Sequence, residues 1–282
     1  MKVNLFPKRK SVRRFTDRAI EKSKLDQFLE FSKQLPILEK NIERELIFVT
    51  DKEWIAETLH SFMLSYGKII AAPYLLLPFY EDNSISQYEL GFQIEHLVLK
   101  ATELELGTCW IEVAEEKIKA RLFEALTDVD IAEKLFVTPV SQDLKQRLND
   151  KVLRVAVLIG YPSLKRIDRI ISNAVRMECK ANARRSVDSF VINRKKKDFP
   201  PILLKILEHA VLAPSARNRQ PWRVRITDDG FDLGGFEEHE IDLGIFMAHL
   251  KISMEHYSKP FKFKRLNETG NDLKWFGSFT LK

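Results

Sequence analysis

The sequence has few cysteines and no long apolar run. Cys109 and Cys179 are its two cysteines in 282 residues, so a small disulfide-stabilised domain is a poor fit. The longest nearly apolar stretch, residues 69–80, contains two prolines and is about half as long as the ~20 residues that a membrane helix needs. The first ten residues lack the apolar region of a signal peptide. We therefore expect a cytoplasmic protein with free thiols and no membrane partner.

The sequence also lacks the common signatures of nucleic-acid and metal binding. It has 46 Lys and Arg against 40 Asp and Glu residues, a net charge of +6, which favours anionic ligands without naming one. No RNP run, zinc-ligand spacing or heptad repeat accompanies this charge, so nucleic-acid binding is the weakest function considered. The run EEHE at residues 237–240 lacks the second histidine of an HExxH site, and we interpret it as an exposed acidic stretch.

Three blocks of the sequence occur twice in the same order. The paired ranges are residues 9–15 and 184–190, 29–51 and 207–229, and 89–101 and 242–254. The offset falls from 177 at Asn41 and Asn218 to 153 at Gly91 and Gly244, so the second copy has lost 24 residues between these blocks. Collinear repeats indicate an internal duplication. The length fits two domains, which we place at residues 1–166 and 167–282.

Apolar spacing predicts similar elements in both halves. Helices are indicated in four segments, residues 25–33, 90–104, 202–212 and 243–257. Strands are indicated in five, residues 45–51, 74–80, 153–162, 222–229 and 230–236, of which the last two form a hairpin across Asp229-Gly230. A basic helical segment at residues 167–180 joins the halves. Helices packed on a mostly antiparallel sheet in two related lobes correspond to an α+β fold class.

The first candidate binding segment is RKSVRRF at residues 9–15. Arg9, Ser11 and Arg13 alternate, so in an extended segment their side chains project to one side. Guanidinium groups with a hydroxyl between them suit a phosphate or a planar, electron-rich heterocycle, because arginine presents paired donors in a fixed fork. The alternative is a solvated basic run.

Two further segments could hold a ligand. Residues 213–222 (APSARNRQPW) form a rigid loop that offers hydrogen bonds beside an aromatic ring; a tight turn between a helix and a strand is the alternative. Residues 158–162 (LIGYP) precede Lys165, Arg166 and Arg169, which could hold an anion near the end of a strand or belong to a charged interlobe helix.

Together these segments resemble the FMN-dependent nitroreductase family over nearly the whole chain. RKSVRRF resembles the family's Arg-Arg-Ser-Ile-Arg-x-Phe opening, and APSARNRQPW its Pro-Ser-x-x-Asn-x-Gln-Pro-Trp loop. Residues 89–111 (ELGFQIEHLVLKATELELGTCWI) resemble its Asp-x-Gly helix and Gly-x-x-Cys-Trp-Ile strand, and LIGYP its terminal strand. The chain is most similar to the subgroup called putative TM nitroreductases, in which TM does not mean transmembrane.

The resemblance implies how FMN would be held. Arg9 would meet the phosphate, and Lys10 and Ser11 would contact the phosphate and ribityl region. The cation that assists Arg9 stays open among three residues, Arg166, Arg169 and Lys165.

The resemblance also assigns the ring contacts. Arg13 would face N1 and the C2 carbonyl and stabilise the negative charge that develops on reduction, which makes it the catalytic residue. Lys68 would approach the isoalloxazine ring. The second lobe would cover the ring with four residues, Pro214, Ser215, Ala216 and Asn218.

The two halves of this implied site come from different lobes. Family members are usually homodimers, in which each site takes the arginine segment from one subunit and the loop from the other. Here the first lobe carries the intact segment and the second the intact loop, which implies a monomer that acts as an internal pseudodimer with one surviving site. At the other position Asp188 stands for Arg13, and Ile37 stands for Ser215.

The resemblance implies an enzyme. We expect an oxidoreductase that transfers electrons from NAD(P)H through FMN to a nitroaromatic, a quinone or a similar small acceptor, with no metal ion. The alternative is an FMN- or small-ligand-binding protein of the same fold with little or no turnover, because one site has been lost. The physiological acceptor and the choice between NADH and NADPH stay open.

Overall fold

The computed structural model describes residues 1–60, 72–127, 132, 135–136, 143–166, 168, 170, 173, 177, 180, 183–195, 198–236, 238–270 and 273–281. Lys68, Arg169, Cys179 and most of the predicted connecting helix at 167–180 lie outside these residues. Among the described residues, no helix combines the length and the apolarity needed to cross a bilayer.

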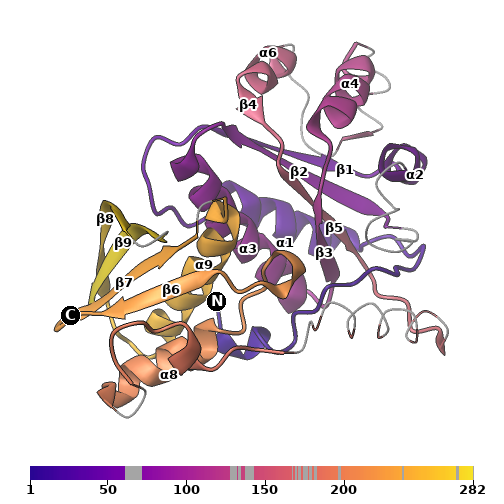
Figure 1. Ribbon diagram of the computed structural model, residues 1–282. Coiled ribbons are helices and arrows are strands. Elements are labelled where there is room, and N and C mark those ends of the chain that lie inside the picture. The colour runs from indigo at the N-terminus through magenta and orange to yellow at the C-terminus, as the bar shows by residue number, and fades with distance from the viewer. Residues whose placement is uncertain are drawn as a thin grey trace.

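The first lobe is built around a five-stranded antiparallel sheet (Figure 1). Its strands follow the order β1 (Arg44–Val49), β2 (Tyr74–Glu81), β5 (Val155–Gly160) and β3 (Gly107–Glu112), and the short β4 (Lys151–Val152) pairs with β2. Helices cover one face with α1 (Lys22–Lys33) and α3 (Ser84–Glu103), and the other with α2 (Lys52–His60), α4 (Glu115–Ala125) and α6 (Leu144–Asn149). Because both faces are covered, β2 and β5 are almost entirely buried.

The second lobe repeats this strand order with shorter connections. Its antiparallel sheet has the order β6 (Trp222–Ile226), β7 (Gly230–Gly235), β9 (Leu273–Leu281) and β8 (Phe261–Gly270), with α8 (Pro201–Ala210) and α9 (Glu240–His256) packed on it. In each main sheet path the spatial order is first, second, fourth and third along the chain. A short turn between β6 and β7 replaces the segment that carries α2 between β1 and β2. The residues that the repeat lost therefore include a peripheral helix.

These elements confirm the α+β class and the two related lobes with mostly antiparallel sheets. The hairpin predicted across Asp229-Gly230 is formed by β6 and β7, with Ile226 opposite Phe231. Strands β8 and β9 were not predicted. The domain boundary between residues 166 and 167 stays a prediction.

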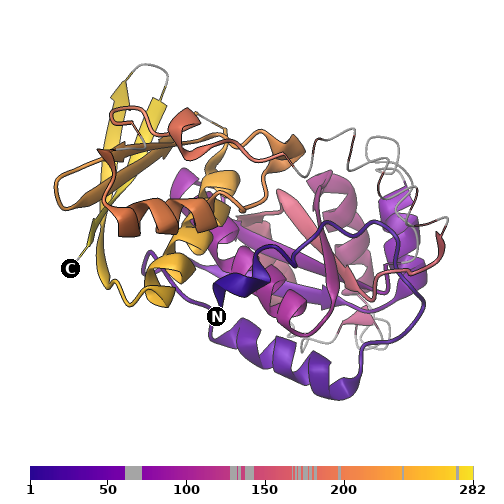
Figure 2. The same cartoon turned by 90° about the horizontal axis from the view of Figure 1, so that it is seen from below.

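Helices α3 and α9 pack against each other where the lobes meet, and two glycines permit their close approach. A β-carbon at Gly91 would lie 2.1 Å from the carbonyl oxygen of Ile241, and one at Gly244 would lie 2.0 Å from that of Tyr88. In the repeat, Gly91 corresponds to Gly244 and Tyr88 corresponds to Ile241. The contact is therefore reciprocal, as across a two-fold axis. Figure 2 shows the lobes side by side, with the N-terminal segment starting at their junction.

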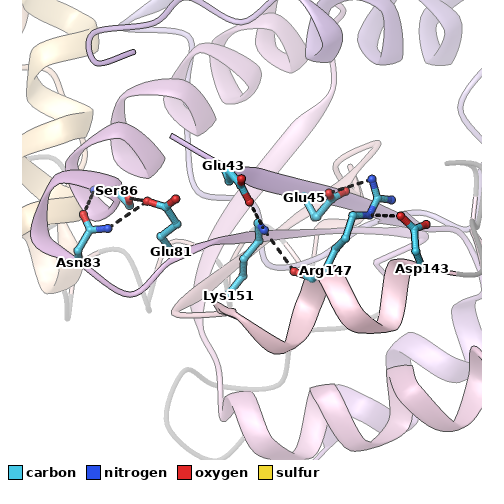
Figure 3. A network of polar contacts seen from close by, with 8 residues as sticks. All are labelled: Glu43, Glu45, Glu81, Asn83, Ser86, Asp143, Arg147 and Lys151. Carbon is cyan, nitrogen blue, oxygen red and sulfur yellow. Dashed lines mark hydrogen bonds and ion pairs between the residues drawn. The ribbon is translucent and has the colours of Figure 1, made fainter. Parts of the chain in front are cut away.

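Ion pairs join α6 and β4 to the start of β1 (Figure 3). The buried ammonium of Lys151 donates to Oε2 of Glu43 at 3.1 Å and to the carbonyl of Arg147 at 3.2 Å. The more exposed guanidinium of Arg147 pairs with Glu45 at 3.3 Å and with Asp143 at 3.6 Å. This network holds an outer edge of the first sheet.

Candidate functional site

A cavity of about 910 Å³ lies at the junction of the two lobes. The first lobe contributes Arg13, the turn from β2 to α3 at residues 82–84, and residues 110–112 of β3. The second contributes most of the loop at residues 214–219 and the start of α9 at residues 238–242. Small-molecule pockets typically measure about 300–1,000 Å³, so this cavity has room for a cofactor.

Arg13 reaches the cavity from an extended segment that lies against β3. The N–H of Val12 donates to the carbonyl of Thr108 at 2.8 Å, and Ser11 and Thr108 form a parallel bridge. The Nε and Nη1 atoms of Arg13 are buried and have no hydrogen-bond partner in the described part of the chain. Buried donors without acceptors are costly, so this guanidinium is suited to bind an acceptor that enters the cavity.

The wall from the second lobe is the loop that follows α8. The N–H of Ala216 donates to Oδ1 of Asp242 on α9 at 2.9 Å, and the N–H of Gln220 donates to Oγ of Ser215 at 2.9 Å. These bonds fix the loop so that Pro214, Ser215 and Ala216 all line the cavity. Arg13 and three of the predicted loop residues therefore meet at one cavity, although they are about 200 positions apart in the sequence.

Asn218 belongs to the same loop but does not line this cavity. Its Nδ2 donates to the carbonyls of Lys180 at 2.7 Å and Ala183 at 2.9 Å, and its Oδ1 accepts from Arg184 at 2.9 Å. The amide thus ties the loop to the chain that begins the second repeat. Its predicted contact with a flavin ring stays a prediction.

The other predicted residues do not line the cavity within the described ranges. Arg9 is buried, whereas Lys10 is exposed. Beyond β5, Lys165 and Arg166 are exposed. Roles at a cofactor stay predictions for Arg9, Lys10, Ser11 and Arg166, and for Lys68 and Arg169, which lie outside the described residues.

Parts of the wall were not selected from the sequence. Trp110 belongs to the Gly-Thr-Cys-Trp-Ile run at residues 107–111 and Asp242 to the repeated helix, so the motifs contained the signal for both. The interpretation of residues 237–240 as an exposed acidic stretch is wrong in part: residues 238–240 line the cavity, and His239 and Glu240 are half-buried.

The described side chains include no group of three or more His, Cys, Asp or Glu that could hold a metal ion.

The same loop-to-helix bond occurs at the equivalent position of the other lobe. The N–H groups of Leu38 and Glu39 donate to the carboxylate of Glu89 at 3.2 Å, and in the repeat Leu38 corresponds to Ala216 and Glu89 to Asp242. Burial raises the pKa of Glu89 to about 7, although these N–H groups act in the opposite direction.

That equivalent position is nearly filled. The hollow there measures about 50 Å³, and the rings of Tyr88 and Phe276, which line it, stack at 4.4 Å between centroids. This volume is far below that of a typical ligand pocket. Of the two equivalent positions, only the interlobe cavity has space for a cofactor.

Comparison with one solved structure supports the fold, and two further structures show similar sequence identity over part of the chain. A putative nitroreductase from Thermotoga maritima is 21% identical and has a TM-score of 0.58, with 98% of this chain and 93% of that chain covered. A nitroreductase family protein from Clostridium difficile 630 is 22% identical with a TM-score of 0.43, covering 58% of this chain and 86% of that one. An FMN-dependent nitroreductase from Clostridium difficile R20291 is 21% identical with a TM-score of 0.44, covering 58% and 89%.

The family follows from the sequence match. A search of curated proteins gave no match. A family model described as "Putative TM nitroreductase" matches residues 3–132 and 136–254, which together are most of the chain and fall in both lobes. The chain belongs to this TM nitroreductase family.

Proposed function

We propose that the interlobe cavity binds FMN and that the chain is an oxidoreductase, which takes electrons from NAD(P)H and passes them to a nitroaromatic, a quinone or a similar small acceptor. Membership of a nitroreductase family supports the reaction class. The observation that carries the proposal is that Arg13 and the loop residues 214–216 line one large cavity from opposite lobes.

The residues of the cavity fit a flavin. The pyrimidine edge of a flavin offers hydrogen-bond acceptors, and Arg13 has two buried nitrogens without a hydrogen-bond partner in the described chain. Trp110 and Ile241 add apolar surface against which a planar ring can pack. The cavity is also larger by an order of magnitude than the hollow at the equivalent position, which supports one FMN for each chain.

The chain's own groups would bind and orient rather than react. FMN supplies the atom that accepts and returns hydride. The fixed positive charge of Arg13 stabilises negative charge on the side of the cavity that it faces. Asp242 holds the loop through Ala216, and the loop forms one wall of the cavity.

The roles that the resemblance gives to the other residues belong to the same proposal. Arg9, Lys10 and Ser11, with Arg166 or Arg169, would serve the phosphate side, and Lys68 and Asn218 the ring. We also propose that a single chain suffices for a complete site, because each half of the cavity comes from one of its own lobes.

The test begins with FMN binding. The purified chain is saturated with FMN, its visible spectrum is recorded, and the released flavin is counted; we expect about one FMN per chain. Arg13→Asp should abolish binding, because it places a carboxylate where Asp188 stands in the other repeat. Arg194→Asp, a charge reversal at a surface ion pair with Asp228, is the matched control and should bind normally.

Turnover is measured on the same samples. Oxidation of NADH and NADPH is followed with a quinone and with a nitroaromatic as acceptors. Two FMN per chain, or normal binding by Arg13→Asp, would contradict the proposed site. Stoichiometric binding without turnover would favour the ligand-binding alternative.

A further inference from the structure

A buried carboxylate lies directly behind the wall of the interlobe cavity. Glu95 of α3 accepts a hydrogen bond at Oε2 from the indole Nε1 of Trp110 at 3.2 Å. Its other oxygen, Oε1, lies 2.9 Å from Nε2 of His249 on α9. The side chains of Glu95 and His249 are fully buried, whereas Trp110 is half-buried and lines the cavity. One acid therefore connects the helix pair between the lobes with the cavity wall.

The chemistry of this cluster requires an acceptor at Glu95. The indole N–H of Trp110 can only donate, so the carboxylate is its proper partner. Nδ1 of His249 is buried without a hydrogen-bond partner in the described chain, and burial lowers the pKa of this histidine. A neutral imidazole that donates from Nε2 satisfies both observations, because a charged ring would leave a second N–H unsatisfied. The positive charges near His249 are those of Arg9 and Arg184.

The cluster occurs once, although the helices that carry it are repeated. In the repeat, Glu95 corresponds to Ala248, and His249 corresponds to His96. His96 contacts the carbonyl of Phe92 in its own helix at 2.7 Å and so makes a local bond instead. Of these two equivalent helix positions, only the one behind the open cavity carries an acid. Burying a carboxylate is expensive, so an acid at Glu95, where the repeat has Ala248, calls for a reason beyond packing.

We propose that Glu95 is a positioning residue that fixes the indole of Trp110 as part of the flavin-binding wall, with His249 as its support. This inference rests on the proposed function. Trp110 lies on β3, to which the segment that carries Arg13 is held through Val12 and Thr108. Fixing this indole therefore fixes part of the wall of the cavity that Arg13 also lines.

The first experiment needs no flavin. The chain has four tryptophans, so ¹⁵N-labelled protein gives four indole N–H signals, and Trp110→Phe identifies the one that belongs to Trp110. A bond to a buried carboxylate moves an indole proton downfield. Glu95→Gln, which keeps the shape and removes the charge, should move the Trp110 signal upfield and leave the other three in place. An unchanged Trp110 signal would overturn the proposal.

The second experiment is a flavin titration of a double-mutant cycle. Glu95→Gln should weaken FMN binding by about ten-fold, the effect of losing a charged hydrogen bond. In the Trp110→Phe background the same change should alter binding by about two-fold or less, because the donor is already gone. His96→Gln, at the next position of the same helix, is the control for general damage to α3 and should bind FMN as the wild type does. Equal losses in both backgrounds, or the same loss in His96→Gln, would overturn the positioning role.

The two proposals fail separately. If the wild type binds no FMN, the proposed function is wrong, and an upfield shift of the Trp110 signal in Glu95→Gln still supports the fixing of the indole by Glu95. If Glu95→Gln does not fold, His249→Gln tests the hydrogen bond between His249 and Glu95 from α9. It should also shift the Trp110 signal, and an unshifted signal would count against the proposal.

Discussion

Gly91 and Gly244 make the same backbone contact in opposite directions, each facing a carbonyl oxygen of the other's helix. The added methyl of an alanine at either position would overlap that oxygen, and no flexible side chain is there to move away. The glycines thus set the distance between α3 and α9, and through it the width of the junction where the cavity lies.

Gly91→Ala and Gly244→Ala should each destabilise the protein by about 3 kcal/mol, because the helices must separate to admit the methyl group. Urea unfolding measures the loss. Gly270→Ala is the control, since a β-carbon there meets nothing within 4 Å, and its effect should stay within about 0.5 kcal/mol. A small effect at Gly91 would show that the helix pair is not tightly packed.

Glu89 should make the protein less stable as the pH rises. Burial holds the pKa of its carboxyl at about 7 in the native state, against 4.5 ordinarily. Between these values the native state keeps a proton that the unfolded chain loses, so stability falls by up to about 3 kcal/mol as the pH rises from 4.5 to 7. Glu89→Gln removes this contribution.

The measurement is the free energy of unfolding at pH 5, 6, 7 and 8 for both proteins. Burial also lowers the pKa of His96 to about 4, which gives the opposite slope below pH 6.5. That group is present in both proteins, so the difference between them isolates Glu89. The advantage of Glu89→Gln should grow with pH up to about 7; parallel curves would refute the assignment.

Asp242→Ala should weaken FMN binding by about ten-fold, because it releases the N–H of Ala216 and with it the loop that lines the cavity. Asp82→Ala is the matched control. That carboxylate also lines the cavity, but it forms an exposed ion pair with Arg154 at 2.7 Å and does not hold the loop. Flavin fluorescence during titration compares the two, and equal losses would argue against the loop's part in binding.

Glu43→Gln should destabilise the first lobe by about 1–2 kcal/mol, because it leaves the buried ammonium of Lys151 without its carboxylate (Figure 3). Glu45→Gln should cost about 0.5 kcal/mol or less, since Arg147 is 43% exposed and also pairs with Asp143. Thermal or urea unfolding of the two variants tests this order. The reverse order would mean that water already solvates Lys151.

The elements with a regular apolar pattern were predictable, whereas β9 was not, although it buries Trp275, Phe276 and Phe279. Strand β2 is almost wholly apolar and α3 carries a regular apolar stripe, so both leave strong patterns in the sequence. Strand β8 has only a short alternation, at residues 261–264, because it lies at the edge of its sheet with mostly exposed residues. Its Lys262, Lys264 and Arg265 are typical of edge strands, which use charge to avoid pairing with other chains.

The candidate site was predictable where a motif fixes the local chain, and less so where tertiary contacts decide. Arg13 and the loop residues 214–216 were selected from motifs, and they do meet at the cavity. Arg9, from the same motif as Arg13, is buried and does not line the cavity, and its N–H donates to the carbonyl of Leu5 in a turn at 3.0 Å. The partners of Asn218 are Lys180, Ala183 and Arg184, whose position only the folded chain determines.

The covalent link between the two lobes has a consequence for how the cavity persists. Arg13 and Ala216 belong to one polypeptide, so dilution cannot separate the halves as it would separate two subunits. The link also means that the two equivalent positions are encoded by different codons, so a mutation at one does not change the other. In a homodimer one codon would alter both cavities at once, whereas here Glu89 and Asp242 are encoded separately, and one pocket could fill in while the other stayed open.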